Sequence, residues 1–525
     1  MKLRDYNRAF LRSSWYSGVK SGLLLLEKAQ INLAFCSLIR NFAAQKHEME
    51  EFFDMQKLIY IAGLLFVLVA CSRREAKECS EAMPEIFPDY VGVTVPENIC
   101  PMNFSVPECE HVRAIVENDR GEALNVSGSD HVEMPVNRWH ELLKGAQEVK
   151  VTVSAWNQKH PDGVNYKPFT INIAKDKIDP WIAYRLLPPG YEGWNHMGIY
   201  QRNIECFDVE PIIENSQNNN GCVNCHSFAN YSPRDFTFHA RGENGGTIVM
   251  RDGKMWKVDI KAMSKGRHGS YNIWHPSKRY IAFSSNSTHQ SFYGESKNKI
   301  EVYDLWSDLI VYDIDNEEVL QDERFTDSLN LEIFPSFSPD GKWLYFSTAH
   351  PVNMPMETDK LHYSIVRVPF DTETGKLGAL DTVYSAYERG GTALMPRISP
   401  DGRYMLFSLG ECGAFNLYHT ESDLKMMDLD TGEMVETDII NSPRMESFHV
   451  WSSNGRWVMY VTKRFDGRYT RVMLAYWDGK RFHKPFLLPQ KDPEDNTQLL
   501  MAYNVVEFIT GPVIVSRDEM AKLFK

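Results

Sequence analysis

The chain has 525 residues, more than one domain of ordinary size, and 43% of them are hydrophobic, which is enough for sizeable cores. Its 70 acidic residues outnumber its 57 basic residues and give a formal net charge of −13. This balance argues against nucleic acid as a partner, because a nucleic-acid-binding surface needs a basic patch.

The first recognisable feature is a signal for export. Met55-Gln56-Lys57 forms a short basic start, residues 58–68 form a compact apolar run, and Leu68-Val69-Ala70-Cys71 has the pattern of a lipobox. A transmembrane helix is the alternative interpretation, but the run is short for a bilayer core of about 30 Å. We therefore expect residues 55–71 to be a lipoprotein signal peptide and Cys71 to carry the lipid.

Residues 1–54 precede a complete signal, so we expect translation to begin at Met55 and these residues to be a mis-annotated extension. The expected location is the cell envelope, lipid-anchored to a membrane. The polar run 72–75 has no acidic cluster, which favours a periplasm-facing anchor. Disulfides are permitted outside the cytosol. Their pairing stays open for the remaining cysteines, which are Cys79, Cys100, Cys109, Cys206 and Cys412.

Two segments follow the expected lipid anchor. Residues 72–88 are polar and mixed in charge, which is typical of a tether. Residues 89–190 contain several short runs of alternating hydrophobicity separated by turn residues, such as Pro161-Asp162-Gly163, and they predict a small Ig-like β-sandwich. No cluster of polar residues marks a site in this segment.

The strongest chemical signal is Cys222-Val223-Asn224-Cys225-His226, because Cys-x-x-Cys-His is the attachment signature of a c-type haem. Cys222 and Cys225 would form thioether links to the porphyrin, and His226 would be the proximal iron ligand. We expect residues 191–239 to form a connector that carries this signature and one covalent haem c.

Other interpretations of the two cysteines remain open. A structural zinc site needs a second pair of Cys or His residues, which the sequence does not show. A thioredoxin-like redox pair expects a strand leading into a helix, and here the flanks are rich in Asn and Gly. A structural disulfide, or a chance occurrence among nine cysteines, is the last alternative.

The sixth iron ligand decides between electron transfer and the binding of a small molecule at the iron. His239 is the first candidate. Met197 is the second, and it would raise the reduction potential relative to ligation by two histidines. An open distal position is the third possibility.

From residue 240 onward the chain repeats a tight turn followed by an alternating strand. Successive turns lie about 60 residues apart, against about 40–45 per blade in common propellers, so insertions are expected on one face. We predict six blades over residues 240–525, and an array of β-sandwiches is the alternative. The repeats are His275-Pro276-Ser277-Lys278, Ser338-Pro339-Asp340-Gly341, Ser399-Pro400-Asp401-Gly402 and Ser452-Ser453-Asn454-Gly455.

These units resemble the WD40-like repeats of TolB-type β-propellers over residues 240–515. The chain after Cys71 resembles exported lipoproteins in which such a propeller follows an embedded Cys-x-x-Cys-His, a family sometimes labelled cytochrome c biosynthesis proteins. The resemblance implies an all-β fold with a C-terminal propeller. It also implies a haem-site role for Cys222, Cys225 and His226.

The leading functional hypothesis is a membrane-anchored protein with one covalent haem, which transfers electrons and uses the propeller to dock a protein redox or assembly partner. The alternative is a non-enzymatic propeller scaffold or binding lipoprotein with structural cysteines. No Gly-x-Ser-x-Gly or His-Glu-x-x-His motif suggests a hydrolase. A haem peroxidase would need an open iron and a distal acid–base group, a role that His239 could take.

Overall fold

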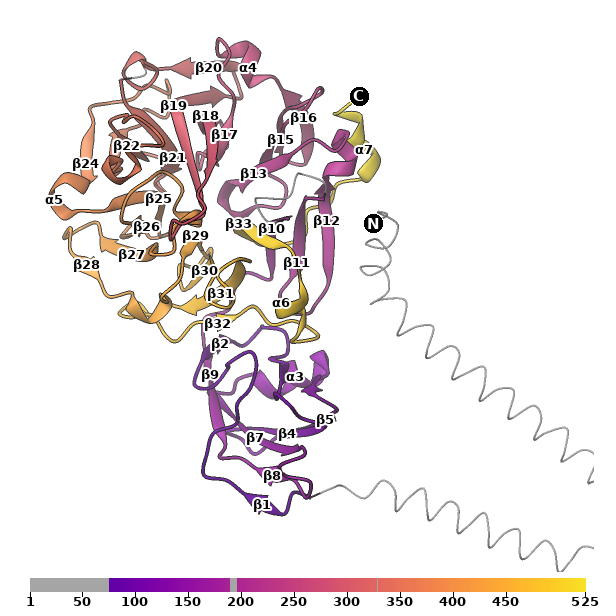
Figure 1. Cartoon of the computed structure of the whole chain (residues 1–525). Helices are drawn as coiled ribbons and strands as arrows, with labels where there is room; N and C mark the ends of the chain where they lie inside the picture. Colours follow the sequence, from indigo (N-terminus) through magenta and orange to yellow (C-terminus); the bar gives the residue numbers. More distant parts are fainter. Residues whose placement is uncertain (1–74, 189–195, 328) are drawn as a thin grey trace, which may run out of the picture. The chain divides into compact units, whose positions relative to one another are not determined.

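The computed structural model describes residues 75–188, 196–327 and 329–525, and these residues form the predicted all-β fold (Figure 1). The expected extension, the signal peptide and the lipidation site Cys71 lie outside the described residues. None of the helices in the described ranges has the length and apolar character needed to cross a membrane.

The first folded part is a small domain with a seven-stranded sheet in the order β1-β8-β7-β4-β5, in which β9 also pairs with β7 and β2 pairs with β9. The β1–β8 and β2–β9 pairs are parallel, so this domain differs from the antiparallel Ig-like sandwich that the sequence predicted. A two-stranded sheet, β3–β6, and helix α3 complete it. The bounds are β1 (Glu78–Cys79), β2 (Thr94–Pro96), β3 (Phe104–Ser105), β4 (His111–Asn118), β5 (Ala123–Gly128), β6 (His131–Val132), α3 (Val136–Leu143), β7 (Glu148–Trp156), β8 (Val164–Asn165) and β9 (Phe169–Ala174).

Six four-stranded sheets follow and form the blades of a β-propeller (Figure 1). Blades 2 to 6 each use four consecutive strands, the first of which is innermost. Blade 2 is β13 (Val223–Phe228), β14 (Phe236–Ala240), β15 (Gly246–Arg251) and β16 (Lys254–Val258). Blade 3 is β17 (Ser270–Trp274), β18 (Tyr280–Phe292), β19 (Ile300–Asp313) and β20 (Glu318–Gln321). Blade 4 is β21 (Leu331–Phe337), β22 (Trp343–Ala349), β23 (Ser364–Pro369) and β24 (Asp381–Tyr384). Blade 5 is β25 (Thr392–Ile398), β26 (Tyr404–Gly410), β27 (Asp423–Asp428) and β28 (Met434–Val435). Blade 6 is β29 (Glu446–Trp451), β30 (Trp457–Thr462), β31 (Arg471–Tyr476) and β32 (Phe486–Leu487).

Blade 1 closes the ring by combining strands from distant parts of the chain. It consists of β12 (Val209–Glu214), β11 (Gly198–Asn203), β10 (Trp181–Leu187) and the late strand β33 (Ala502–Ile509), which is innermost. β33 pairs antiparallel with β10 along its whole length, from Trp181 opposite Ile509 to Leu187 opposite Ala502. β33 therefore pairs with the inner edge of β10, which would otherwise be unpaired, and ties the C-terminal part of the chain to blade 1.

The segment 191–239 is not the connector that the sequence predicted. It supplies β11 and β12 to blade 1 and β13 to blade 2, so the propeller begins at Trp181 rather than at residue 240. The propeller begins before residue 240 because Ser232-Pro233-Arg234-Asp235 forms a turn between β13 and β14. Ser338-Pro339-Asp340-Gly341 forms the same turn between β21 and β22. In each turn the fourth residue donates its backbone N–H to the carbonyl of the first.

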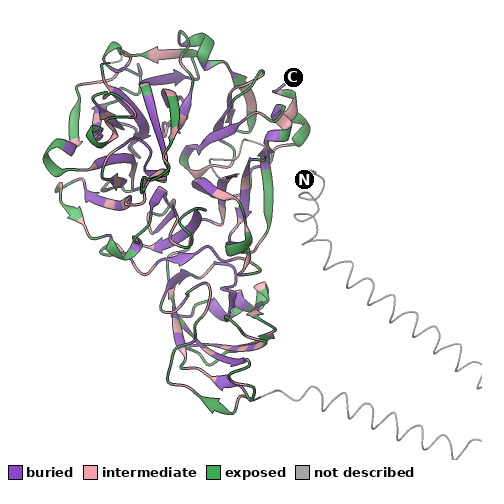
Figure 2. Cartoon of the chain, in the orientation of Figure 1, coloured by how far each residue is buried: buried purple, intermediate pink, exposed green. Residues whose placement is uncertain are grey.

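Residues 246–260 and 501–515 do not form separate blades. Residues 246–260 provide the outer strands β15 and β16 of blade 2, and residues 501–515 contain β33. The count of six blades is nevertheless confirmed. The inner strands are largely buried, and neither β13 nor β21 has an exposed residue (Figure 2).

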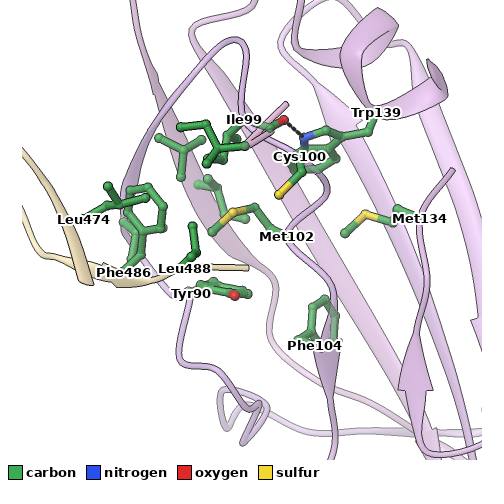
Figure 3. Close-up of a cluster of buried hydrophobic side chains, with 14 of the residues drawn as sticks. Tyr90, Ile99, Cys100, Met102, Phe104, Met134, Trp139, Leu474, Phe486 and Leu488 are labelled. Atoms are coloured by element: carbon green, nitrogen blue, oxygen red, sulfur yellow. Dashed lines mark hydrogen bonds between the residues drawn. The ribbon is translucent and has the colours of Figure 1, made fainter. Parts of the chain in front are cut away.

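The N-terminal domain and blade 6 share one hydrophobic cluster. Leu474, Phe486 and Leu488 of blade 6 belong to the same cluster as Tyr90 and Met102 of the first domain (Figure 3). Within that cluster the indole of Trp139 donates a hydrogen bond of 3.1 Å to the carbonyl of Ile99.

Hydrogen bonds tie the segment between the two domains to blade 6. The indole of Trp457 donates to the carbonyl of Asp176 at 3.0 Å, and the Tyr476 hydroxyl donates to the Asp176 carboxylate at 2.6 Å. The carboxylate of Asp179 accepts from the backbone N–H and the hydroxyl of Ser453 at 2.7 and 2.6 Å. Blade 6 thus anchors the segment that links the two domains.

Ring closure generates a prediction about β33. Phe508 is fully buried on this strand opposite Ile182, so Phe508→Ala should lower the free energy of unfolding by about 3–5 kcal/mol, the usual cost of truncating a buried phenylalanine. Urea denaturation followed by tryptophan fluorescence measures this change. Phe292→Ala, at a side chain that is 62% exposed, is the matched control and should change stability by less than about 0.5 kcal/mol. Equal effects of the two changes would contradict closure by β33.

Candidate functional site

The haem-type signature lies on the innermost strand of blade 2, in a feature that every blade repeats. The pairing of each inner strand with its neighbour is interrupted by a β-bulge. One residue of each bulge has a positive φ of 41–57°, which is uncommon for residues other than glycine. These six residues are Cys225, Tyr271, Phe334, Met395, Phe448 and Val505.

The bulges meet around a small cavity among the inner strands. The six left-handed residues and those that directly follow them line it, together with Arg397, and its volume is about 40 Å³. Such a space holds a few water molecules. In this ring His226 occupies the position that Pro335, Pro396 and His449 occupy in other blades, so the last two residues of the signature coincide with a structural repeat.

Cys222 and Cys225 lie in different surroundings, and both are buried. Cys225 borders the small cavity, and burial raises the pKa of its thiol. The sulfur of Cys222 lies 3.4 Å from Nη2 of Arg185 on β10, and the same nitrogen lies 3.5 Å from the sulfur of Met197. The structure therefore brings the predicted ligand Met197 close to Cys222, with a guanidinium between them.

His226 is a buried imidazole with unused hydrogen-bonding capacity. It is 2% exposed, and neither ring nitrogen has a hydrogen-bond partner of normal geometry. Burial and the charge of Arg185 lower its pKa to about 3, against a smaller opposing effect of the Ala183 carbonyl. The ring is therefore neutral at physiological pH, as an iron ligand would be.

His239, the other predicted ligand, belongs to a different cavity. It lies on β14 opposite Asn224, and its Nδ1 is 3.4 Å from the Thr247 hydroxyl. With His268, whose ring centroid is 6.5 Å away, it lines a cavity of about 530 Å³ beside blades 2 and 3. Burial lowers the pKa of His239 to about 3, and the charges of Arg241 and His268 add smaller effects in the same direction.

The residues present can be compared with the needs of a covalent haem. The donor chemistry is suitable, because two thiols, a neutral imidazole without partners and a thioether lie in neighbouring positions. The space is not suitable, because pockets for ligands of this size measure about 300–1,000 Å³ and the cavity at Cys225 and His226 measures about 40 Å³. In the described part of the chain, no group of three or more His, Cys, Asp or Glu residues is arranged to hold a metal ion. A porphyrin does not fit this arrangement, and haem attachment stays a prediction.

The long insertions predicted between repeats gather at one end of the ring. They connect the second and third strands of blades 3, 4 and 5, and the one in blade 3 extends the β18–β19 hairpin. Asn298 in this hairpin accepts a hydrogen bond of 3.1 Å from the backbone N–H of Thr420, and Tyr293 donates one of 3.5 Å to the carbonyl of Pro355. The hairpin thus reaches the loops of blades 4 and 5.

A buried charge cluster fastens this hairpin, and sequence reasoning missed it. His419 is 2% exposed and lies 2.9 Å from the carboxylate of Glu301 on β19 and 3.1 Å from that of Glu421. Burial alone would lower the pKa of His419, but the hydrogen bonds to the two carboxylates outweigh it and raise the pKa to about 9. The imidazolium is therefore the form present at neutral pH. His419 and Glu301 are 118 positions apart in the sequence, so only the fold brings them together.

Beside the hairpin lies a cleft of about 620 Å³. The hairpin tip, the loops that carry Tyr418, Arg444 and Lys463, and the start of β33 line it. Sequence reasoning did not identify this cleft, because its walls come from six separate stretches of the chain. The only signal in the sequence was the long spacing between the repeats, which predicts insertions on one face.

No family model matches the sequence, and no curated protein matches it. Among solved structures, the chain is similar to Kuenenia stuttgartiensis hydrazine synthase (14% identity, TM-score 0.29), with 49% of this chain and 64% of that chain covered. An oligogalacturonate lyase in complex with manganese shows 11% identity and a TM-score of 0.33, with 59% of this chain and 74% of that chain covered. The β-propeller domain of the Trilobed protease from Pyrococcus furiosus shows 12% identity and a TM-score of 0.29, with 64% of this chain and 80% of that chain covered. At these scores the similarities carry no argument about function.

The charge cluster predicts a pH-dependent stability. Because the folded pKa of His419 is raised above its ordinary value of 6.5, its contribution is complete below pH 6.5 and is lost as the pH rises through about 9. His419→Gln should therefore lower the free energy of unfolding by about 3 kcal/mol at pH 6 and by clearly less at pH 9.5. Urea denaturation of both proteins at the two pH values measures this, and an equal difference at both would contradict the assignment.

Proposed function

We propose that this chain is a non-enzymatic binding scaffold built on a six-bladed propeller, in which Cys222, Cys225 and His226 belong to the structural core. One observation carries the proposal. Cys225 and His226 occupy the same inner-strand bulge that the other blades fill with residues such as Tyr271 and Phe334, in a ring with a cavity of about 40 Å³.

The contacts of the signature residues support this structural role. The carbonyl of Cys225 accepts a hydrogen bond from the Asn272 side chain, whose oxygen accepts one from the Ser227 hydroxyl at 2.6 Å. Cys222 belongs to the hydrophobic cluster that joins blades 1 and 2 and includes Met197 and Phe238. Blade 2 therefore uses its cysteine-bearing strand to pack against both neighbouring blades.

Electron transfer by a covalent haem is the second candidate function. The sequence signature favours it, and so do the unpartnered ring nitrogens of His226. Cys222 and Cys225 would hold the haem, with Met197 or His239 as the further ligand. This candidate requires Arg185 and the inner strands to move, because a porphyrin does not fit their present packing. Export, lipidation at Cys71 and a partner that docks on the propeller are compatible with both candidates.

Haem content separates the two candidates. We expect the chain, exported from a host that has the c-type haem maturation machinery, to show no reduced c-type absorbance bands and no mass increase equal to a haem. The Cys222→Ala/Cys225→Ala double variant, made in parallel, should give the same spectrum. A covalent haem in the original chain that the double variant lacks would overturn the scaffold proposal and establish the second candidate.

A structural role for Cys222 also predicts a change in stability. Removing its buried sulfur in Cys222→Ala should lower the free energy of unfolding by about 1 kcal/mol, since losing one buried heavy atom has a cost of this size. Cys206→Ala, at a half-buried thiol, is the matched control and should have an effect below about 0.5 kcal/mol. Chemical denaturation under reducing conditions provides the comparison. An unchanged stability for Cys222→Ala would count against the structural role.

A further inference from the structure

The cleft beside the β18–β19 hairpin has the size of a ligand site. Its volume of about 620 Å³ lies within the range of about 300–1,000 Å³ that is typical of pockets for small molecules. The hairpin that forms one wall is fastened by the buried contacts of His419 with Glu301 and Glu421. This wall is therefore held in place before any ligand arrives.

The charge of the cleft is opposite to that of the whole chain. Although the chain has a net charge of −13, five lining residues are Lys or Arg and only one has a carboxylate. That carboxylate, on Asp466, accepts backbone hydrogen bonds of 2.7 and 2.8 Å within its own loop. The five cationic residues are Lys297, Lys299, Arg444, Lys463 and Arg468. Lys297 forms an ion pair of 3.3 Å with Glu421, which lies outside the lining, and the remaining excess of cations favours an anionic ligand.

Lys463 is the most informative of these residues. Its ammonium donates a hydrogen bond of 2.7 Å to the carbonyl of Leu417 and lies 5.3 Å from the centroid of the Tyr418 ring. It forms no ion pair within the described ranges, and burial lowers its pKa to about 8 against a smaller opposing effect of the Asp466 carboxylate. An ammonium has three donor hydrogens. An acidic group in the cleft would therefore supply both the missing charge and further acceptors.

Aromatic rings provide the remaining walls. Tyr293 lies in the hairpin, Tyr418 lies beneath Lys463, and Tyr503 lies near the start of β33. Tyrosine rings offer an apolar face together with a polar edge. The guanidinium of Arg444 lies against Gly467, where an added Cβ would be 3.1 Å from its Nη1. Cations and ring faces thus line the same space.

We propose that this cleft binds an acidic sugar, with its carboxylate or phosphate held by Lys463 and Arg444 and its ring packed against Tyr293 and Tyr418. A saccharide ring has the apolar faces and the hydroxyl edge that such a wall accommodates, and the acidic group matches the cations. The inference deepens the proposed binding role and rests on it. It does not depend on the state of Cys222, Cys225 and His226.

Calorimetric titration of the purified full chain at pH 7 and low salt tests the proposal. The probes are glucuronate and glucose 6-phosphate, which distinguish carboxylate from phosphate recognition, with glucose and inorganic phosphate as controls. We expect at least one acidic sugar to bind with a dissociation constant of about 1 mM or tighter, glucose not to bind, and phosphate alone to bind at least tenfold more weakly.

Variants assign the binding to the cleft. Lys463→Met should weaken binding of the acidic sugar at least about tenfold, and Arg444→Gln, at an exposed residue, provides a second test if the first variant fails to fold. Lys342→Met is the matched control, because Lys342 is 74% exposed on the inner turn of blade 4. This variant should bind the acidic sugar with unchanged affinity. Circular dichroism checks that each variant is folded.

Three results would overturn the proposal. They are the absence of binding by both acidic sugars, equal affinity of inorganic phosphate (an adventitious ion only), or unchanged affinity in the folded cleft variants. The haem assay reports on the signature and the titration reports on the cleft. Failure of the scaffold proposal is therefore distinguishable from failure of this one.

Discussion

The pairing of β33 with β10 is the interaction on which the rest of the structure depends. It joins residues 502–509 to residues 181–187 and makes one closed ring out of six sheets. Closure brings all six inner strands around one axis, where each contributes one residue in a left-handed conformation. Non-glycine residues hold such conformations only when their surroundings enforce them, so the crowded centre is a consequence of closure.

Closure of the ring also determines the surroundings of the cysteine signature. Cys225 and His226 lie where five other strands leave a cavity of about 40 Å³, while the neighbouring Cys222 packs between blades 1 and 2. The same ring places the insertions of blades 3, 4 and 5 at one end, where the contacts of His419 fasten the long hairpin. The centre of the propeller is therefore closely packed, and a cleft of about 620 Å³ lies among the loops.

The sequence was sufficient for the all-β class, the six blades and the position of the insertions, because turns such as Ser338-Pro339-Asp340-Gly341 depend only on local chemistry. It was insufficient for blade 2, because Ser232-Pro233-Arg234-Asp235 has no glycine at its fourth position and follows a motif interpreted as a haem connector. Blade 1 could not be inferred, because its strands are about 300 residues apart. The cleft around Lys463 likewise exists only after folding, because it combines loops from several blades.

We propose that the signature cysteines are free, buried thiols of the propeller core. Alkylation of the exported chain before and after denaturation, with each site identified by peptide mass spectrometry, tests it most directly. We expect exposed Cys79 to react in the native protein, whereas Cys222 and Cys225 should react only after unfolding. A structural role for these thiols is ruled out if Cys222 and Cys225 remain unreactive in denaturant because thioether bonds block them, or if they react readily in the native state.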